Sequence, residues 1–210
     1  MTVGVLVIGA GGHAKVVIEA ARAAGHHVVG LIAPDPVGTR VLGAAVLGDD
    51  DILARLHAGG LVEAVVALGD NRRRDAMQAV LQSLGYALPP IVHPTAWLSP
   101  SARLGAGTVV LQQAAISAEA MIGCGVIINS AAVVEHDAEI GDFAHVAPGV
   151  ALAGRVRIGA RSLVGVGSAV RPGVAIGADV VVGAGSVVVA DVADGLTVVG
   201  CPARPLGKPA

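Results

Sequence analysis

The C-terminal part of the chain carries an apolar residue at every sixth position. From Val92 to Val188, seventeen consecutive members of this series are Val, Ile or Leu without a gap. The residue four positions after each of them is small or β-branched, so every repeat supplies one aliphatic and one small side chain. This period is typical of a parallel β-helix, in which short strands stack coil upon coil around a narrow interior. We therefore predict a β-helix over 91–210, with glycines such as Gly105 and Gly123 serving its turns.

Before Val92 the pattern changes to that of a small α/β unit. Apolar runs that predict strands alternate with longer mixed segments that predict helices. The expected strands cover Val3–Ile8, Val28–Ile32 and Val62–Leu68, and the expected helices cover Val16–Ala24, Asp50–His57 and Asn71–Leu84. Pro89-Pro90 marks the boundary. We therefore predict two domains: a Rossmann-like α/β nucleotide-sugar-binding domain over 1–90 and the β-helix with its C-terminal tail over 91–210.

Composition narrows the possible functions. Phe, Trp and Tyr occur once each in 210 residues, so the core must consist of aliphatic side chains, and base stacking on aromatic rings is excluded. The net charge of −2, from 14 basic and 16 acidic residues, argues against nucleic acid as a partner. The mean hydropathy is high at +0.74, but no uncharged stretch reaches the ~20 apolar residues that span a bilayer. No membrane partner is expected.

Cysteine usage and the N-terminus bear on the compartment. Cys124 and Cys201 form no CxxC pair, and the first residues lack a basic leader. We expect a cytoplasmic protein without a metal site.

A glycine-rich turn follows the first predicted strand. Gly9, Gly11 and Ala14 fit a GxGxxG/A fingerprint, in which glycine lets the backbone approach a phosphate group at a helix N-terminus. A dinucleotide fold needs a second mononucleotide-binding half, for which about ninety residues leave little room. The turn therefore favours a nucleotide or nucleotide sugar over NAD. The alternative is that these glycines only form a tight turn.

These features together resemble a known family over nearly the whole chain. The first strand, the turn Gly9–Lys15, the short α/β unit and the unbroken β-helix are similar to the NeuD/PglD-like sugar acetyltransferases. That family includes bacterial UDP-4-amino-sugar N-acetyltransferases and sialic acid O-acetyltransferases. The segment Asn129–Val146 and the closing Gly200–Arg204 carry the resemblance most specifically. The resemblance implies that the β-helix is left-handed. Periodicity alone does not set the handedness.

The resemblance also implies roles for residues of the β-helix. The histidine that matches His136 is the general base in such enzymes, and the acidic residue after it, here Asp137, increases its basicity. The histidine that matches His145 contacts the co-substrate, acetyl-CoA. Val166 and Ala184 match backbone contacts of the pantetheine and adenine ends of CoA. The family forms homotrimers with active sites between adjacent β-helices, so a homotrimer is expected.

For the acceptor, the resemblance points to the N-terminal domain. Gly11, Gly12 and His13 match the family's nucleotide-sugar turn. Relatives often carry consecutive acidic residues after the second strand, whereas this chain has only Asp35 there. That departure leaves the base open between uracil and guanine. Gly69, after the third strand, is a second expected edge of the acceptor pocket.

The repeat itself is compatible with these roles. His136 and His145 occupy neither of the two inward slots, so both side chains are free to face a cleft. An imidazole has an unperturbed pKa of about 6.5, which suits proton removal near neutrality, and a neighbouring carboxylate favours the imidazolium that forms. Asn129 is a candidate hydrogen-bond donor to the acceptor or the thioester. Phe143 is an outward aromatic that either lines the acceptor cleft or lies at its rim.

We therefore predict an acetyl-CoA-dependent N-acetyltransferase that acts on a UDP- or GDP-linked 4-amino sugar in surface glycan biosynthesis. Direct transfer in a ternary complex is expected, because Cys124 lies two repeats from His136 and on a different face. Two alternatives stay open. One is O-acetylation of a sugar such as sialic acid, or of a small hydroxyl acceptor such as serine. The other is a non-catalytic β-helix scaffold, against which the Glu135-His136-Asp137 cluster argues.

Overall fold

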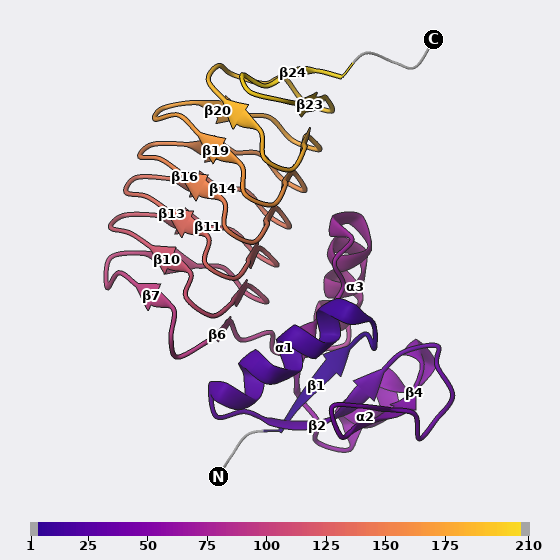
Figure 1. Cartoon of the computed structure of the whole chain (residues 1–210). Helices are drawn as coiled ribbons and strands as arrows, with labels where there is room; N and C mark the ends of the chain where they lie inside the picture. Colours follow the sequence, from indigo (N-terminus) through magenta and orange to yellow (C-terminus); the bar gives the residue numbers. More distant parts are fainter. Residues whose placement is uncertain (1–3, 207–210) are drawn as a thin grey trace.

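The structure, a computed structural model, describes residues 4–206 and consists of an α/β unit followed by a β-helix (Figure 1). Val3, the first residue of the predicted first strand, and residues 207–210 of the predicted tail lie outside the described residues. The predicted fold class is confirmed: an N-terminal α/β unit with a largely parallel sheet precedes a left-handed parallel β-helix. Among residues 4–206, no helix is both long and apolar enough to cross a bilayer.

The N-terminal unit contains a five-stranded sheet in the order β3-β4-β2-β1-β5. Its strands are β1 (Gly4–Ile8), β2 (His27–Ile32), β3 (Arg40–Val41), β4 (Ala44–Gly48) and β5 (Glu63–Val66). Its helices are α1 (Gly12–Ala23), the 3-10 turn η1 (Asp50–Ile52), α2 (Leu53–Ala58) and α3 (Asn71–Ser83). The central strand β1 pairs in parallel with β2 and β5. One apolar cluster joins α1 to the sheet, and a second joins α2 and α3 to it.

The hairpin β3–β4 is an element that the sequence pattern does not predict. Its two strands are antiparallel and meet at Leu42-Gly43, where both residues have positive φ, 48° and 81°. Two-residue hairpin turns of this conformation are usually marked by Asn-Gly or Asp-Gly. Leu42 carries no such signal, so the segment resembles an ordinary loop.

The β-helix is built from two-residue strands that form three faces. Face 1 contains β6 (Ile91–Val92), β9 (Val109–Val110), β12 (Ile127–Ile128), β15 (His145–Val146), β18 (Leu163–Val164) and β21 (Val181–Val182), and ends in β23 (Thr197–Val199) and β24 (Arg204–Pro205). Face 2 contains β7 (Trp97–Leu98), β10 (Ala115–Ile116), β13 (Val133–Val134), β16 (Ala151–Leu152), β19 (Ala169–Val170) and β22 (Val187–Val188). Face 3 contains β8 (Arg103–Leu104), β11 (Met121–Ile122), β14 (Glu139–Ile140), β17 (Arg157–Ile158) and β20 (Ala175–Ile176).

The hexapeptide period corresponds to one strand and one corner. Ala115 pairs with Val133 in the next coil, so a coil takes 133 − 115 = 18 residues, or three repeats. The predicted aliphatic series is the second residue of each strand from β6 to β22. Beyond the first coil these side chains are buried in one continuous cluster. Val92, Leu98 and Leu104 are only partly buried, because no coil lies below them.

From the corner after β8 to the corner after β21, each corner has one position with a left-handed backbone, three residues after the aliphatic position. Glycine fills it at some corners, while eight others carry a different residue: Gln113, Glu119, Ala131, Asp137, Phe143, Arg155, Arg161 and Asp179. The glycines that directly follow the aliphatic residues have another reason. A Cβ on Gly141 would lie 2.7 Å from the backbone nitrogen of Ala160 in the next coil. The stacking of coils, rather than turn conformation, therefore requires glycine there.

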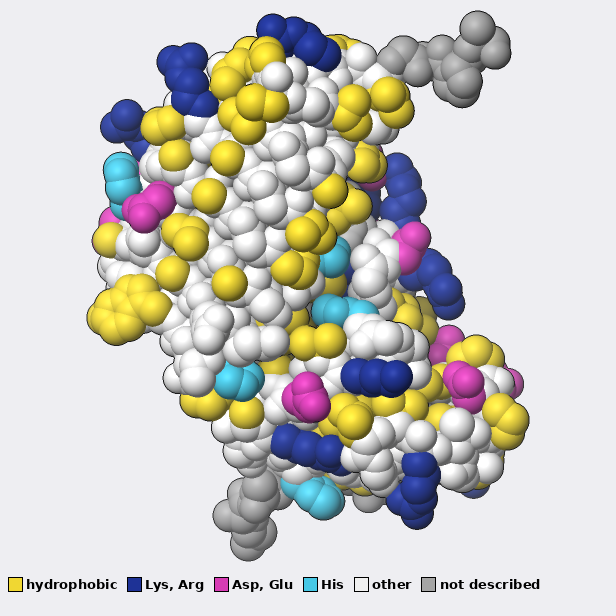
Figure 2. Space-filling view, in the orientation of Figure 1, with side chains coloured by type: hydrophobic (Ala, Val, Ile, Leu, Met, Phe, Trp, Pro, Cys, Tyr) yellow, Lys and Arg dark blue, Asp and Glu magenta, His cyan; other side chains and the backbone are white. Residues whose placement is uncertain are grey.

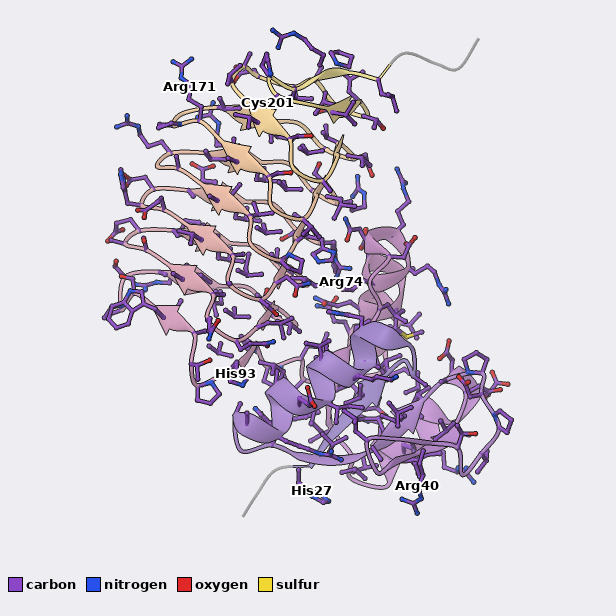
Figure 3. All side chains as sticks on the ribbon, in the orientation of Figure 1. His27, Arg40, Arg74, His93, Arg171 and Cys201 are labelled. Carbon is purple, nitrogen blue, oxygen red and sulfur yellow. The ribbon has the colours of Figure 1, made fainter. Side chains whose placement is uncertain are left out.

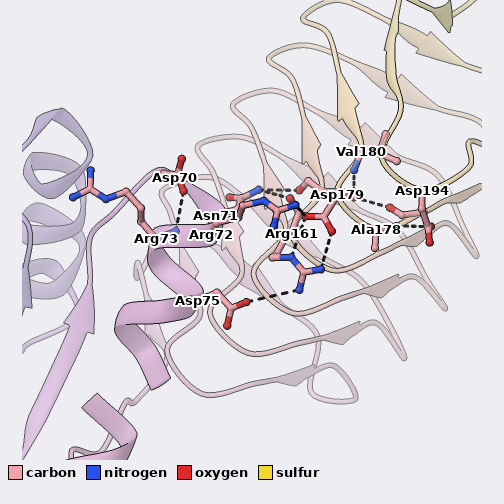
Figure 4. Close-up of polar contacts among 12 residues, drawn as sticks. Asp70, Asn71, Arg72, Arg73, Asp75, Arg161, Ala178, Asp179, Val180 and Asp194 are labelled. Carbon is pink, nitrogen blue, oxygen red and sulfur yellow. Dashed lines mark hydrogen bonds and ion pairs between the residues drawn. The ribbon is translucent and has the colours of Figure 1, made fainter. Parts of the chain in front are cut away.

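Three corners join the faces. Corner 1–2 leads from face 1 to face 2, corner 2–3 from face 2 to face 3, and corner 3–1 back to face 1. The N-terminal unit contacts face 1 and corner 3–1. The outward side chains of Ile91 and Val109 join the apolar cluster of α1, and the N-terminal half of α3 forms polar contacts with corner 3–1 (Figure 4).

Candidate active site

His136 and Asp137 form a hydrogen-bonded pair at corner 2–3. The Nδ1 atom of His136 lies 2.7 Å from Oδ2 of Asp137, and the two side chains are 55% and 52% exposed. Because a carboxylate only accepts, Nδ1 donates, and the lone pair of the neutral ring lies on Nε2. The ring rests over Gly154 in the next coil, where a Cβ would come within 2.6 Å of Nε2. The pair thus offers an accessible, oriented imidazole with a lone pair on its outer nitrogen.

A second cluster lies where face 1 meets the N-terminal unit, and it brings together His145, Asn129 and His13. Nδ2 of Asn129 lies 3.0 Å from Nε2 of His145. The Asn129 oxygen accepts from the backbone N–H of Ser130 at 2.8 Å, so the amide nitrogen must be the group that donates to His145. Nε2 of His145 is therefore an acceptor, and Nδ1 carries the hydrogen. The His13 ring lies 6.3 Å from that of His145, centroid to centroid.

Both histidines of this cluster are held neutral. Burial, together with the nearby positive charge of Arg74, lowers the pKa of His13 to about 4. Burial, Arg74 and His13 lower the pKa of His145 to about 3. Nε2 of His13 is buried and has no hydrogen-bond partner within residues 4–206. The arrangement provides neutral hydrogen-bonding groups rather than a base that works near neutral pH.

The two clusters lie on different parts of the β-helix. His145 points outward from face 1, and Asn129 begins corner 1–2, whereas His136 and Asp137 lie at corner 2–3. Face 2 separates these corners. Val166 and Ala184 occupy the same slot of corner 1–2 in successive coils, above the coil of Asn129, and both are exposed. The candidate CoA contacts therefore share a corner with Asn129 and not with His136.

The predicted acceptor turn lies at the N-terminus of α1. Gly11 is the N-cap of this helix and Gly12 its first residue. A Cβ on either would meet no atom of the chain within 4 Å, so the space beside them is open. Gly9 differs: its φ is +121°, and a Cβ there would lie 3.0 Å from the carbonyl oxygen of Ala67. Open space at a helix N-terminus suits a phosphate group that approaches the backbone.

Asp35 and Gly69 line two separate cavities. Asp35 borders a cavity of about 460 Å³ at the carboxyl end of β2, together with Asp49 and Arg55. Gly69 borders one of about 260 Å³ between the start of α3 and face 1. Asp49 follows the unpredicted strand β4, which explains why sequence reasoning did not include it. A third cavity, about 1070 Å³, is an open groove along face 3 that contains none of the predicted site residues.

Phe143 lies away from His136, at corner 3–1. Its ring is beside Gly125, and its carbonyl oxygen accepts a hydrogen bond from Arg74 of α3. Phe143 is therefore at another corner of the β-helix than His136 and Asp137. Within the described residues, no group of three or more His, Cys, Asp or Glu side chains is placed to hold a metal ion.

Comparisons with known proteins find a family model and solved structures that are similar to this chain. Residues 4–81 match the family model described as the PglD N-terminal domain. The perosamine N-acetyltransferase PerB of Caulobacter crescentus, solved with CoA and GDP-perosamine, is 48% identical over 97% of both chains, with a TM-score of 0.95. A histidine-to-asparagine mutant of the same enzyme, with the same ligands, is 47% identical and also has a TM-score of 0.95.

A second solved structure is similar along its whole length. The acetyltransferase domain of PglB from Neisseria gonorrhoeae, in complex with acetyl coenzyme A, is 40% identical over 98% of this chain and 100% of that domain, with a TM-score of 0.94. Comparison with the curated proteins gives no match. The similarities thus extend over both units of the chain.

Proposed function

This chain belongs to the NeuD/PglD-like family of sugar acetyltransferases, and from that premise we propose that its acceptor is a GDP-linked 4-amino sugar. It is an acetyl-CoA-dependent N-acetyltransferase of nucleotide-linked 4-amino sugars. The choice of GDP rests on one observation: this chain is 48% identical, over 97% of both chains, to an enzyme solved with CoA and GDP-perosamine.

The cavity beside Asp35 supports guanine as the base. Guanine presents two neighbouring donors, N1–H and the exocyclic N2 amine, whereas uracil presents one donor between two carbonyl oxygens. Carboxylates are acceptors only and form strong hydrogen bonds to paired donors. Asp35 and Asp49 both border this cavity. A base with paired donors therefore suits its lining better than uracil does.

A homotrimer would complete the site. Face 2 presents an outward row of uncharged, mostly aliphatic side chains on a surface almost free of charge (Figure 2); the row is Trp97, Ala115, Val133, Ala151, Ala169 and Val187. Exposed apolar faces of this kind mark protein interfaces. If three copies turn face 2 toward a threefold axis, corner 2–3 of each copy comes beside corner 1–2 of the next. His136 of one subunit would then lie beside Asn129 and the candidate CoA contacts at corner 1–2 of its neighbour.

In this arrangement the acetyl group moves directly from sulfur to nitrogen. The neutral sugar amine attacks the thioester carbonyl carbon, a C–N bond forms, and Nε2 of His136 takes the proton that the nitrogen loses. Asp137 stabilises the resulting imidazolium. The Nδ1–H of His145 donates to the carbonyl oxygen as negative charge develops there. The C–S bond then breaks, and the imidazolium returns the proton to the departing CoA thiolate.

A thiol-release assay tests the proposal. Acetyl-CoA is offered with GDP-, UDP- and dTDP-linked 4-amino sugars, with free sialic acid, and with a GDP sugar that carries a 4-hydroxyl group as the matched control. We expect the highest kcat/KM with the GDP-linked amine and no turnover with the 4-hydroxyl control. Higher kcat/KM with the UDP-linked amine would overturn the choice of base, and turnover of free sialic acid alone would overturn N-acetylation.

A further inference from the structure

Arg74 is a fully buried cation that lies between the two units (Figure 3). It belongs to α3, its side chain is 1% exposed, and no carboxylate within residues 4–206 forms an ion pair with it. Burying a charge without a counter-ion is costly unless every donor is satisfied. Burial lowers the pKa of its guanidinium to about 10, so the group stays charged at neutral pH.

Oxygen atoms from both units satisfy this guanidinium. On the N-terminal side, Nη1 donates to the carbonyl oxygens of Leu68 at 3.0 Å and Gly69 at 3.4 Å, and Nη2 donates to Oδ1 of Asn71 at 2.8 Å. On the β-helix side, Nε donates to the carbonyl oxygen of Gly125 at 2.7 Å. Nη2 also donates to the carbonyl oxygens of Phe143 at 2.6 Å and Ala144 at 3.4 Å.

The groups that Arg74 holds are those next to the candidate site. Gly69 lies in the loop predicted to edge the acceptor pocket, and Ala144 directly precedes His145. A rigid planar fork of donors is suited to joining several fixed oxygens, which the flexible ammonium of Lys cannot do equally. We propose that Arg74 is a positioning residue that sets the acceptor loop against the His145 strand, and so aligns the sugar amine with the thioester. This inference rests on the proposed function.

The charges around Arg74 support the same role. Asp70, the N-cap of α3, and Asp75 of α3 face it with negative charge, while His13 of α1 and His145 of β15 face it with neutral rings. After burial, the positive charge of Arg74 is the next cause that lowers the pKa of both histidines. Removing it would raise these pKa values toward the ordinary value, so His145 would lose its neutral form at a higher pH.

The test compares Arg74→Met and Arg74→Lys with Arg72→Met. Arg72 is the matched control, because it lies on the same helix and also crosses to the β-helix, through a 2.7 Å ion pair with Asp179, but is 72% exposed (Figure 4). For folded Arg74→Met we expect kcat to fall about 10- to 100-fold, because small misplacements at a reacting centre have effects of this size. We also expect a higher KM for the nucleotide sugar, an unchanged KM for acetyl-CoA, and a loss of kcat with acid that begins at a higher pH.

Arg74→Lys should show the same changes to a smaller extent, and Arg72→Met should match wild type. Circular dichroism and molecular mass report whether each variant folds and assembles. If Arg74 served folding alone, kcat would fall with the folded fraction while both KM values and the pH profile stayed unchanged, and that result would overturn the proposal. If Arg74→Met fails to fold, Arg74→Lys decides, and wild-type kinetics in folded Arg74→Lys would equally overturn it. An inactive wild-type enzyme would instead contradict the proposed function.

Discussion

At the scale of single residues, the histidines of the site differ in environment and therefore in the chemistry open to them. His136 is half exposed and paired with a carboxylate, whereas His145 is enclosed and faces a cation, Arg74. A base must be accessible and keep a free lone pair, whereas an oxyanion donor must present a fixed N–H. The environments therefore support His136 as the proposed base and His145 as the proposed donor.

Removal of the proposed base gives a direct prediction. His136→Ala should lower kcat by about 10²- to 10⁴-fold, the usual contribution of a positioned base, with little change in the KM of acetyl-CoA. Steady-state kinetics with the preferred amino sugar measure this. His27→Ala, on the exposed start of β2, is the control. A folded His136→Ala variant with near wild-type kcat would rule out the base.

The neutral histidines also make stability depend on pH. Their folded pKa values, about 4 for His13 and about 3 for His145, lie below the ordinary 6.5. As the pH falls below about 6.5, the unfolded chain binds these protons and the folded chain does not, so the free energy of unfolding decreases toward pH 4. His145→Gln should reduce this slope by about 1.4 kcal/mol per pH unit. Urea denaturation at pH 7, 6 and 5 measures it, and an unchanged slope would contradict the assignment.

At the scale of elements, the β-helix is held by close contact between consecutive coils. Gly141→Ala should destabilise the protein by about 1–3 kcal/mol, because its Cβ would meet the backbone of the next coil and neither side can yield freely. Gly173 is the matched control: its φ is +75°, nothing lies within 4 Å of its Cβ position, and Asn tolerates that conformation. Thermal unfolding should separate Gly141→Ala from Gly173→Asn, and equal melting temperatures would contradict the close-contact explanation.

At the scale of the whole molecule, the placement of the two clusters leads to a test with mixed trimers. His136→Ala and His145→Gln would each disable every site of their own homotrimers. In mixed trimers, a site that takes His136 from one variant and His145 from the other is intact. A site is intact only if the subunit that supplies His136 and the neighbour that supplies His145 are each of the right variant. Random mixing at equal amounts meets both conditions at about one quarter of the sites of a closed ring, so about one quarter of wild-type activity should be restored.

Separately refolded variants, mixed only after assembly, are the control for that experiment. No restored activity in confirmed mixed trimers would mean that each site lies within one chain. A monomeric mass in solution would remove the trimer proposal altogether.

Much of the architecture could be predicted because its causes are local. Every hexapeptide repeat carries its own inward residues, and each coil stacks on the one before it, so the series from Val92 to Val188 predicts all strands from β6 to β22. The turn at Gly11-Gly12 was likewise predictable, since a strand, glycines and a helix follow one another directly. The hairpin β3–β4 was not, because Leu42 adopts a conformation that its side chain does not favour.

The sequence by itself therefore determined the two kinds of fold unit, the inward slots and the residues with suitable chemistry. Only the tertiary structure decided which of those residues meet. It brought His13 beside His145, gave Arg74 partners in both units, and left His136 at another corner. The physical reason is that the repeat determines only the slot of each residue within its coil. Which face and corner of the β-helix lie against the N-terminal unit depends on contacts between segments far apart in the chain.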